Sequence, residues 1–243
     1  MHVDDSFWIL IPPPITHSYG NLAAVAAAII LDPEAMNAVI DEDPISGNVR
    51  EPLLKVVQSL RSLSFTRRSE VKLSNGLLKD VPWKIGQMVF QPPDQFSFFS
   101  SDYAPPGIFS DLDLVSPEAQ VLSMSSVVGI TNGFFSLFNF GLSNADGGFG
   151  PFMSTKRVIG DYSSSVGQIT YQVNEADISS KIDELDTIMT GGRLGTDNKQ
   201  VLTNAYEYFL GAHDIETADR MLLGLMAASP EFQTSNTRKY MMI

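Results

Sequence analysis

The chain has 243 residues and a formal net charge of −12, and its 16 lysines and arginines are spread over the whole length. This balance argues against nucleic acid and anionic membranes as partners, because both attract a basic protein surface. The absence of cysteine excludes disulfides, thiolate nucleophiles and cysteine-bound metal sites. Hydrophobic residues make up 44% of the chain, which is enough to bury a core, so we expect it to fold.

The first twenty residues are expected to be irregular, because the prolines at 12–14 favour an extended polyproline segment. The apolar patch at 7–11 is short and lacks a basic flank, so no signal peptide is recognised in this chain. Asn21 is a suitable N-cap for an uncharged helix over 22–31. Apolar side chains cover nearly the whole circumference of this helix, so we expect it to be buried.

An acidic turn at 41–44 separates two further expected helices, over 32–39 and 52–63. A solvated turn is favoured over a cation site for these acidic residues. The helix over 52–63 opens with Glu51-Pro52 and is amphipathic. Its pattern places Lys55 on the exposed side.

The segment 66–80 is polar and basic, and Ser74–Gly76 predicts a tight turn or a small hairpin within it. Arg67 and Arg68 are candidate anion ligands, and the alternative that we favour is a solvated loop.

The segment 83–107 is rich in aromatic residues and contains repeated Pro-Pro pairs, so it is expected to be irregular. Its aromatic residues are predicted to pack around the core, and the functional alternative is a groove for a sugar or a peptide. These residues are Phe90, Phe96, Phe98, Phe99 and Tyr103.

An uncharged run between Glu118 and Asp146 predicts the central buried helix, over about 117–140. Ser116 is the expected N-cap, and Pro117 suits the first helical position. The expected buried positions are Met124, Val127, Val128, Thr131, Phe134, Phe135 and Phe138. The run is long enough to cross a bilayer, but its polar side chains would lack partners in lipid and no basic flank adjoins it, so no membrane span is expected.

A glycine-rich turn at 144–150 follows this helix instead of opening one, and it matches neither a phosphate loop nor a calcium loop. A short strand is predicted over 168–173, where apolar and polar residues alternate.

Three antiparallel helices are expected after this strand. The first helix begins near Ile178 and stops at Gly191-Gly192. The second is capped by Thr196 or Asp197 and stops at Gly211, and the third begins at Asp214. Expected inner positions include Ile182, Leu185, Met189, Val201, Leu202, Ala205, Tyr208, Phe209, Ile215, Ala218, Met221, Leu222, Leu225 and Met226. The tail at 237–243 is expected to fray.

No set of titratable residues indicates a particular reaction. No catalytic, cofactor-binding or metal-binding residue is therefore assigned, and no cofactor is expected. The three histidines are His2, His17 and His213, and a three-histidine metal site would need two of them from the irregular N-terminus. His213 lies beside Asp214, where a helix cap is favoured over a serine–histidine–aspartate triad.

Carboxylates offer the enzyme alternative, a hydrolase that acts on polysaccharide or its carbohydrate-binding accessory subunit. Asp102, Asp111 and Asp146 are its candidate acids, and its aromatic platform would consist of Trp83, Phe96 and Tyr103. It requires two carboxyl groups about 5–10 Å apart across an open cleft.

Five segments in order carry a resemblance to a known family: AAAIILDPEA at 26–35, GNVREPLLKVVQSLRSL at 47–63, IGQMVFQPPDQFSFFSSDYAPPG at 85–107, LVSPEAQVLSMSSVVGITN at 114–132 and LMAASPEFQTSN at 225–236. Together they resemble the C-terminal half of the domain of unknown function 1800 family. DGGFGP and TGGRL make the chain most similar to algal members. The Asp94-Gln95 pair departs from the family pattern.

The resemblance implies a mostly helical fold, an exported or envelope-associated protein, and no known catalytic residues. We therefore predict a mainly α protein, a helical bundle around the central helix at about 117–140 with long aromatic, proline-rich loops and minor β structure. A single helical domain is expected over 21–236, after the irregular segment 1–20. Because the upstream half of the family pattern is missing, the chain is interpreted as a truncated or divergent short form.

The favoured function is a non-catalytic structural or interaction module. Its partner would be another protein or the missing N-terminal half, docked on an exposed apolar face. The sequence does not determine the oligomeric state.

Overall fold

The structure is a computed structural model that describes residues 21–32, 47–68, 81–95, 97–150, 158–174 and 177–235. The chain forms two compact units, Met1–Ser46 and Gly47–Ile243, each described by itself. Several predicted features lie outside the described residues: the irregular segment 1–20, the helix after Asp32 with its acidic turn, the turn at Ser74–Gly76 and the tail at 237–243. The single domain over 21–236 stays a prediction.

The first unit contributes helix α1 (Leu22–Ile30). Asn21 caps it as predicted, because its side chain accepts a hydrogen bond from the Ala24 backbone N–H at 3.1 Å. The predicted burial is wrong, since Ala24 is the buried residue of this helix and Leu22, Ile29 and Ile30 are exposed. Uniform apolar composition shows that a helix could be covered on every side, but not that a neighbour covers it.

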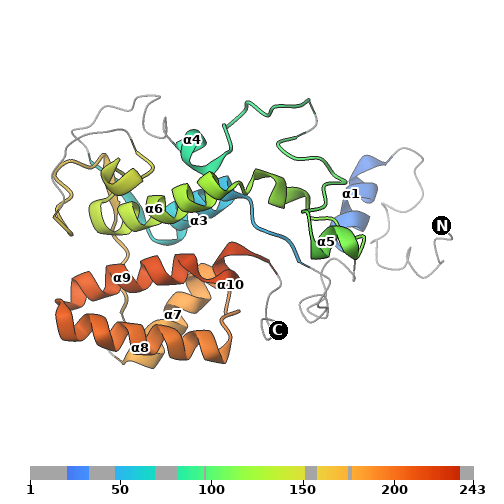
Figure 1. The fold of residues 1–243 in the computed structure, drawn as a ribbon. Coiled ribbons are helices and arrows are strands. Elements are labelled where there is room, and N and C mark those ends of the chain that lie inside the picture. Colours follow the sequence, from blue (N-terminus) through green and yellow to red (C-terminus); the bar gives the residue numbers. More distant parts are fainter. Residues whose placement is uncertain are drawn as a thin grey trace. The chain divides into compact units, whose positions relative to one another are not determined.

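The second unit is mainly helical, which confirms the predicted fold class (Figure 1). Its longer helices are α3 (Pro52–Ser62), α6 (Met124–Phe140), α7 (Ile178–Thr190), α8 (Thr196–Ala212) and α9 (Ile215–Ala228). Shorter pieces are α4 (Val81–Ile85), α5 (Ile108–Asp111), α10 (Pro230–Gln233) and the 3-10 turns η3 (Pro117–Val121) and η4 (Ala145–Gly147). Helix α6 packs on α9, α8 also packs against α9, and α4 lies on the other side of α6.

Helix α6 is the predicted central helix, but it begins at Met124 and not at Pro117. Ser116 makes no side-chain capping bond, and residues 117–121 form a separate 3-10 turn. Ser123 is in an extended conformation, and its hydroxyl accepts from the Ser126 N–H at 3.2 Å. Two serines are thus suitable caps, and the chain uses the second for α6.

The hydrophobic core gathers around the C-terminal half of α6. Phe134 contacts Phe138, Phe149 and Phe232, with ring centroids 5.9, 5.4 and 5.4 Å apart respectively. Phe134 and Phe138 are buried as predicted. The prediction is wrong for Met124, Val127, Val128, Thr131 and Phe135, which are exposed. Helical spacing groups these residues on one face, but tertiary packing decides which part of that face is covered.

A two-stranded antiparallel sheet is the predicted minor β structure. Strand β1 (Phe65–Arg67) pairs with β2 (Gly167–Ile169), and Thr66 lies opposite Gln168. Strand β2 therefore ends earlier than the predicted strand over 168–173. The segment after α4 is irregular as predicted, although Trp83 lies within α4.

The C-terminal helices follow their predicted order. Asp177 caps α7, Gly191 ends it in a left-handed conformation, and Asp214 caps α9. Two predicted boundaries are wrong, because Gly195 is the N-cap of α8 and that helix continues through Gly211 to Ala212. Val201, Tyr208, Ile215 and Leu225 were predicted to point inward but are exposed.

Lys55 is the largest departure from the predicted pattern of α3. It is 1% exposed, and its Nζ donates a hydrogen bond to Gln233 Oε1 at 2.6 Å. Burial, with a smaller contribution from the charge of Arg50, lowers the pKa of Lys55 to about 8. The prediction that Lys55 is exposed is therefore wrong.

The free energy of unfolding is expected to rise by about 2 kcal/mol between pH 8 and pH 10. In this range the unfolded chain, whose lysine pKa is about 10.4, binds a proton that folded Lys55 has released, so deprotonation favours the folded state. Urea unfolding across this pH range should show the rise, and Lys55→Met should remove it. A flat profile in the unsubstituted protein would contradict the assignment.

Candidate functional site

A cavity of about 460 Å³ lies between residues 168–173 and helix α9. Its apolar lining comes from Phe138, Ile169 and Leu223, and polar groups come from both sides. A second hollow of about 310 Å³ is lined in part by Arg67 and Arg68. The two spaces share three lining residues, Tyr162, Gln168 and Thr170. They are therefore adjoining, and we call them together the Tyr162 hollow.

Arg220 is the buried cation of this hollow. Its Nε donates to the Tyr162 hydroxyl at 2.7 Å, and its guanidinium carbon lies 5.5 Å from the centre of that ring. It also forms an ion pair with Glu216, one helical turn earlier on α9. Burial raises the pKa of Tyr162 in spite of the nearby guanidinium, so the phenol stays protonated at neutral pH.

Lys181, Tyr206 and Asp219 form a second polar network, which reaches the cavity through Asp219. Lys181 Nζ donates to Asp219 Oδ1 at 2.7 Å and to the Tyr206 hydroxyl at 2.9 Å. The Tyr206 hydroxyl donates to the same Asp219 oxygen at 2.6 Å. Burial alone would lower the pKa of Lys181, but these two partners raise it. A lysine held in its charged form is suited to a structural ion pair and not to nucleophilic attack.

Tyr171 lies on the same wall and donates a hydrogen bond to Glu184. Burial, reinforced by Glu184, raises the pKa of Tyr171 to about 12. Its phenol is therefore neutral and serves as a hydrogen-bonding aromatic surface. Glu216 and Asp219 also line the cavity, but they lie three residues apart on one helix. They do not face each other across a cleft as the acid and the base or nucleophile of a glycosidase do.

The carboxylates of the enzyme alternative line neither part of the hollow as it is described in this structure. Asp102 is exposed and accepts a hydrogen bond from the Ser100 hydroxyl at 2.5 Å, which lowers the pKa of this carboxyl. A general acid needs the opposite shift. Asp111 is exposed at the end of α5, and Asp146 lies in η4.

The other predicted site residues are dispersed. Trp83 is exposed on α4, Tyr103 is half-buried, and Phe96 lies outside the described residues, as do His2 and His17. His213 is exposed, and Asp214 caps α9 by accepting from the Thr217 N–H at 2.7 Å, as predicted. Over the ranges that the structure describes, no three potential histidine or carboxylate ligands gather into a metal site. In those same ranges, no helix combines the length and the apolar character that a membrane span requires.

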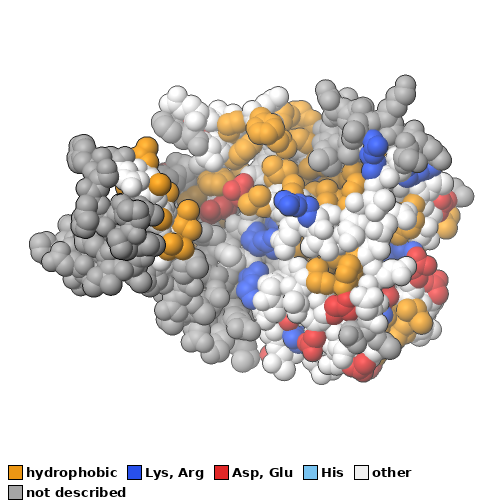
Figure 2. Space-filling model, turned by 180° about the vertical axis from the view of Figure 1, so that it is seen from behind, with side chains coloured by type: hydrophobic (Ala, Val, Ile, Leu, Met, Phe, Trp, Pro, Cys, Tyr) orange, Lys and Arg blue, Asp and Glu red, His pale blue; other side chains and the backbone are white. Residues whose placement is uncertain are grey.

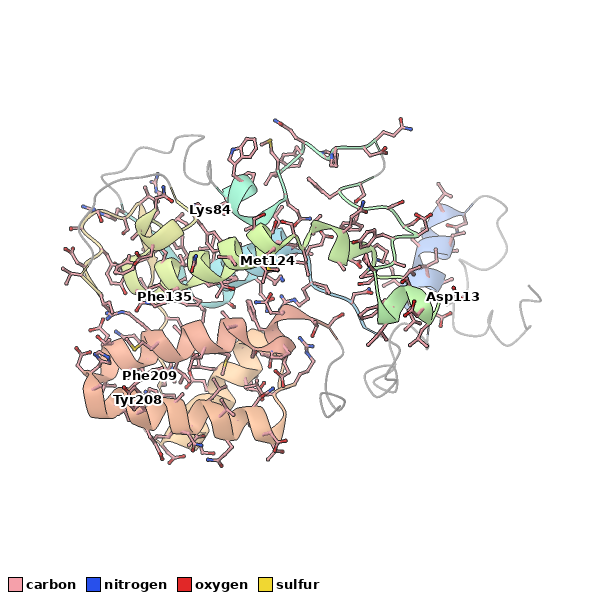
Figure 3. All side chains as sticks on the ribbon, in the orientation of Figure 1. Lys84, Asp113, Met124, Phe135, Tyr208 and Phe209 are labelled. Atoms are coloured by element: carbon pink, nitrogen blue, oxygen red, sulfur yellow. The ribbon has the colours of Figure 1, made fainter. Side chains whose placement is uncertain are left out.

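An apolar surface runs along α6 from Met124 to Phe135, on the face that the core leaves uncovered. Its members, Met124, Val127, Val128, Thr131 and Phe135, follow helical spacing and are exposed, and we call them the α6 face. Figure 3 labels Met124 and Phe135 toward opposite ends of α6 and Lys84 on the adjacent α4. Trp83 on α4 is 79% exposed. Hydrophobic side chains also gather on the face of the molecule seen from behind (Figure 2).

Close backbone contact fixes α4 against α6. A Cβ placed on Gly129 would come within 2.2 Å of the Lys84 carbonyl oxygen, so only glycine fits this crossing. The helix that carries the α6 face is therefore held in place on two sides. Helix α4 contacts it at Gly129, and the hydrophobic core contacts it at Phe134.

The sequence interpretation identified Arg67 and Arg68 but did not connect them with Tyr162, Arg220, Asp219 or Lys181. One local signal was available, because Glu216, Asp219 and Arg220 lie at helical spacing on α9. Tyr162 belongs to a loop whose neighbours in space come from distant parts of the chain, and no local pattern marks it.

Comparisons with known proteins identify a family. No curated protein and no solved structure matches the chain. A family model described as "Protein of unknown function (DUF1800)" matches residues 15–234, which is most of the chain and confirms the resemblance seen in its motifs. The protein therefore belongs to the DUF1800 family of proteins of unknown function.

Proposed function

We propose that the protein is a non-catalytic interaction module of an exported or envelope-associated protein, and that two copies of it associate through the α6 face. The observation that carries this proposal is the exposure of large apolar side chains on a helix without a single charged residue. Met124 is 85% exposed and Val128 is 54% exposed, and residues 124–140 contain no lysine, arginine, aspartate or glutamate.

The absence of charge on the α6 face allows a second copy to be the partner. Each copy carries a net charge of −12, so most relative orientations of two copies bring like charges together. The α6 face adds no charge to such a contact, and its burial removes apolar area from water at about 25 cal/mol per Å². An uncharged apolar face thus adds hydrophobic attraction to a contact between copies without adding repulsion.

The composition of the face also supports an interface. Methionine and aromatic residues are enriched in the centres of protein interfaces, and the face presents Met124 and Phe135 with Trp83 on the adjacent helix. Thr131 satisfies its hydroxyl within the helix by donating to the Val127 carbonyl at 2.9 Å, so burying it strands no donor. Because α6 is held in place before association, little conformational entropy is lost.

Sedimentation equilibrium of the full chain tests the proposal. We expect a concentration-dependent dimer, and Val128→Glu should weaken dimerisation at least ~10-fold, because it buries a charge opposite a negatively charged copy. Val201→Glu is the matched control: Val201 is 61% exposed on α8, outside the α6 face, and should leave the dimer unchanged. A monomer at all concentrations, or equal weakening by both substitutions, would refute the proposal.

A further inference from the structure

We infer that the larger space of the Tyr162 hollow binds an uncharged sugar. This space has a volume of about 460 Å³, which is within the range usual for small-molecule sites. The inference is independent of self-association, because Phe138 is the lining residue that comes from α6, and it does not belong to the α6 face. Arg67 and Arg68 line the smaller space and have interactions of their own within the protein, so no ligand is assigned to them.

The charged side chains of the larger space are paired within the protein. Glu216 and Arg220, which both line it, form an ion pair. Asp219 also lines it and pairs with Lys181, whose Nζ lies 2.7 Å from Asp219 Oδ1. Two carboxylates are thus matched by two cations, and their formal charges cancel. A charged ligand would lose hydration on entering this space without meeting an unpaired opposite charge, so the lining favours an uncharged one.

Polar groups that remain available can bind the hydroxyls of a ligand. Among the residues that the structure describes, the side-chain amides of Gln168 and Gln172 form no hydrogen bond with the protein. Asp219 receives its bonds from Lys181 and Tyr206 at Oδ1, which leaves Oδ2 to accept another. An amide donates and accepts, a carboxylate oxygen accepts, and a hydroxyl can pair with either. The lining therefore matches a ligand that carries several hydroxyls.

Aromatic and aliphatic side chains line the same space. Tyr162 and Tyr171 provide rings, and Phe138 and Leu223 provide buried apolar surface. A sugar ring has apolar C–H faces that pack on such surfaces and hydroxyls at its periphery that need hydrogen bonds. A wholly apolar ligand would bury the amides and the free carboxylate oxygen without partners, which costs free energy. A sugar satisfies both kinds of lining group.

Hydrogen bonds and packing hold both walls of the space in place. On one wall, the Tyr171 backbone N–H donates to the Leu63 carbonyl at 3.1 Å, and on the other, α9 packs on α6. Arg220 Nε donates to the Tyr162 hydroxyl at 2.7 Å, and this hydroxyl donates to the Phe138 carbonyl at 3.4 Å. These bonds tie the Tyr162 loop to both helices. A preorganised lining binds a ligand with little loss of conformational entropy.

Isothermal titration calorimetry of the full chain with glucose, galactose and mannose tests the inference. At least one of these sugars should bind with a saturable heat. Its uronate and its 2-amino derivative should bind at least ~10-fold more weakly, because neither added charge meets an unpaired opposite charge. The amino derivative is measured below neutral pH, where its amine is charged. Adenine, an uncharged ring that donates and accepts hydrogen bonds without hydroxyls, should also bind at least ~10-fold more weakly.

Three results would contradict the inference. Absence of binding by all three sugars would refute it as a whole. Equal affinity for either charged derivative would refute the selection of an uncharged ligand. Equal affinity for adenine would refute the sugar class.

Substitutions locate the site. Gln168→Ala with Gln172→Ala should lower sugar affinity by ~10-fold, and Gln172→Ala alone, on an exposed side chain, should lower it by ~3-fold, because each amide contributes a neutral hydrogen bond. Gln91→Ala with Gln95→Ala is the matched control, since both glutamines are exposed and outside the lining, and it should bind normally. Normal affinity in the first double variant, or equal loss in the control, would refute the location. The Val128→Glu variant should bind the sugar normally, which separates this test from that of the proposed function.

Discussion

Replacement of Gly133 by alanine is expected to lower the free energy of unfolding by about 3–4 kcal/mol. A Cβ at this position would lie 1.9, 2.2 and 2.4 Å from three atoms of the Phe149 ring. That ring is buried and packs edge-on against Phe134, so it cannot move aside without disturbing the core. Chemical denaturation monitored by circular dichroism measures the change.

Gly224→Ala is the control for this prediction. Gly224 also lies within a helix, α9, but no heavy atom outside its own helical turn is within 4 Å of its expected Cβ. Alanine there should stabilise the protein by about 0.5–1 kcal/mol, because glycine has the lower helix propensity. If both substitutions changed the free energy of unfolding by the same amount, the close contact between Gly133 and the Phe149 ring would be refuted.

Phe134→Ala is expected to lower the free energy of unfolding by about 3–5 kcal/mol. Phe134 is buried and joins three parts of the chain, since its ring contacts Phe138 on α6, Phe149 after η4 and Phe232 on α10. Truncation removes these contacts and leaves a cavity that the rigid neighbours fill only in part. Thermal and urea unfolding would both report the loss.

Phe90→Ala makes the same chemical change at a ring that is 96% exposed. We expect an effect below about 0.5 kcal/mol there, because no buried contact is lost. A comparable loss at both positions would mean that Phe90 is covered by the protein and that the aromatic segment packs around the core, as the sequence interpretation had it. A small loss of unfolding free energy in Phe134→Ala would contradict the position of Phe134 in the centre of the core.

Gly133→Ala and Phe134→Ala also bear on the proposed function. The α6 face depends on a helix that is fixed by its buried side, and both Gly133 and Phe134 belong to that side. Destabilising the buried side should loosen the helix and weaken self-association. Val128→Glu acts on the face without touching the core, so the two causes of weakened dimerisation can be separated.

The candidate site was less predictable than the fold. The sequence offered Arg67 and Arg68 as candidate anion ligands and favoured a solvated loop for them. Tyr162 joins their hollow, and Arg220 joins Tyr162, only through long-range contacts. Arg68 reaches the carbonyl of Ser163, 95 positions later, and Arg220 reaches Tyr162 across 58 positions. Contacts at such separations arise from packing and leave no periodic signal in the sequence.

Local chemistry in the sequence determined where the helices form. It also determined the first or last residue of many of them. The caps at Asn21 and Asp214 and the left-handed stop at Gly191 depend on neighbouring residues alone, so they could be read directly. Tertiary structure decided which faces are covered. It buried Lys55 against Gln233 and exposed Met124 and Val128, because burial depends on which distant elements pack against a helix and not on the helix itself.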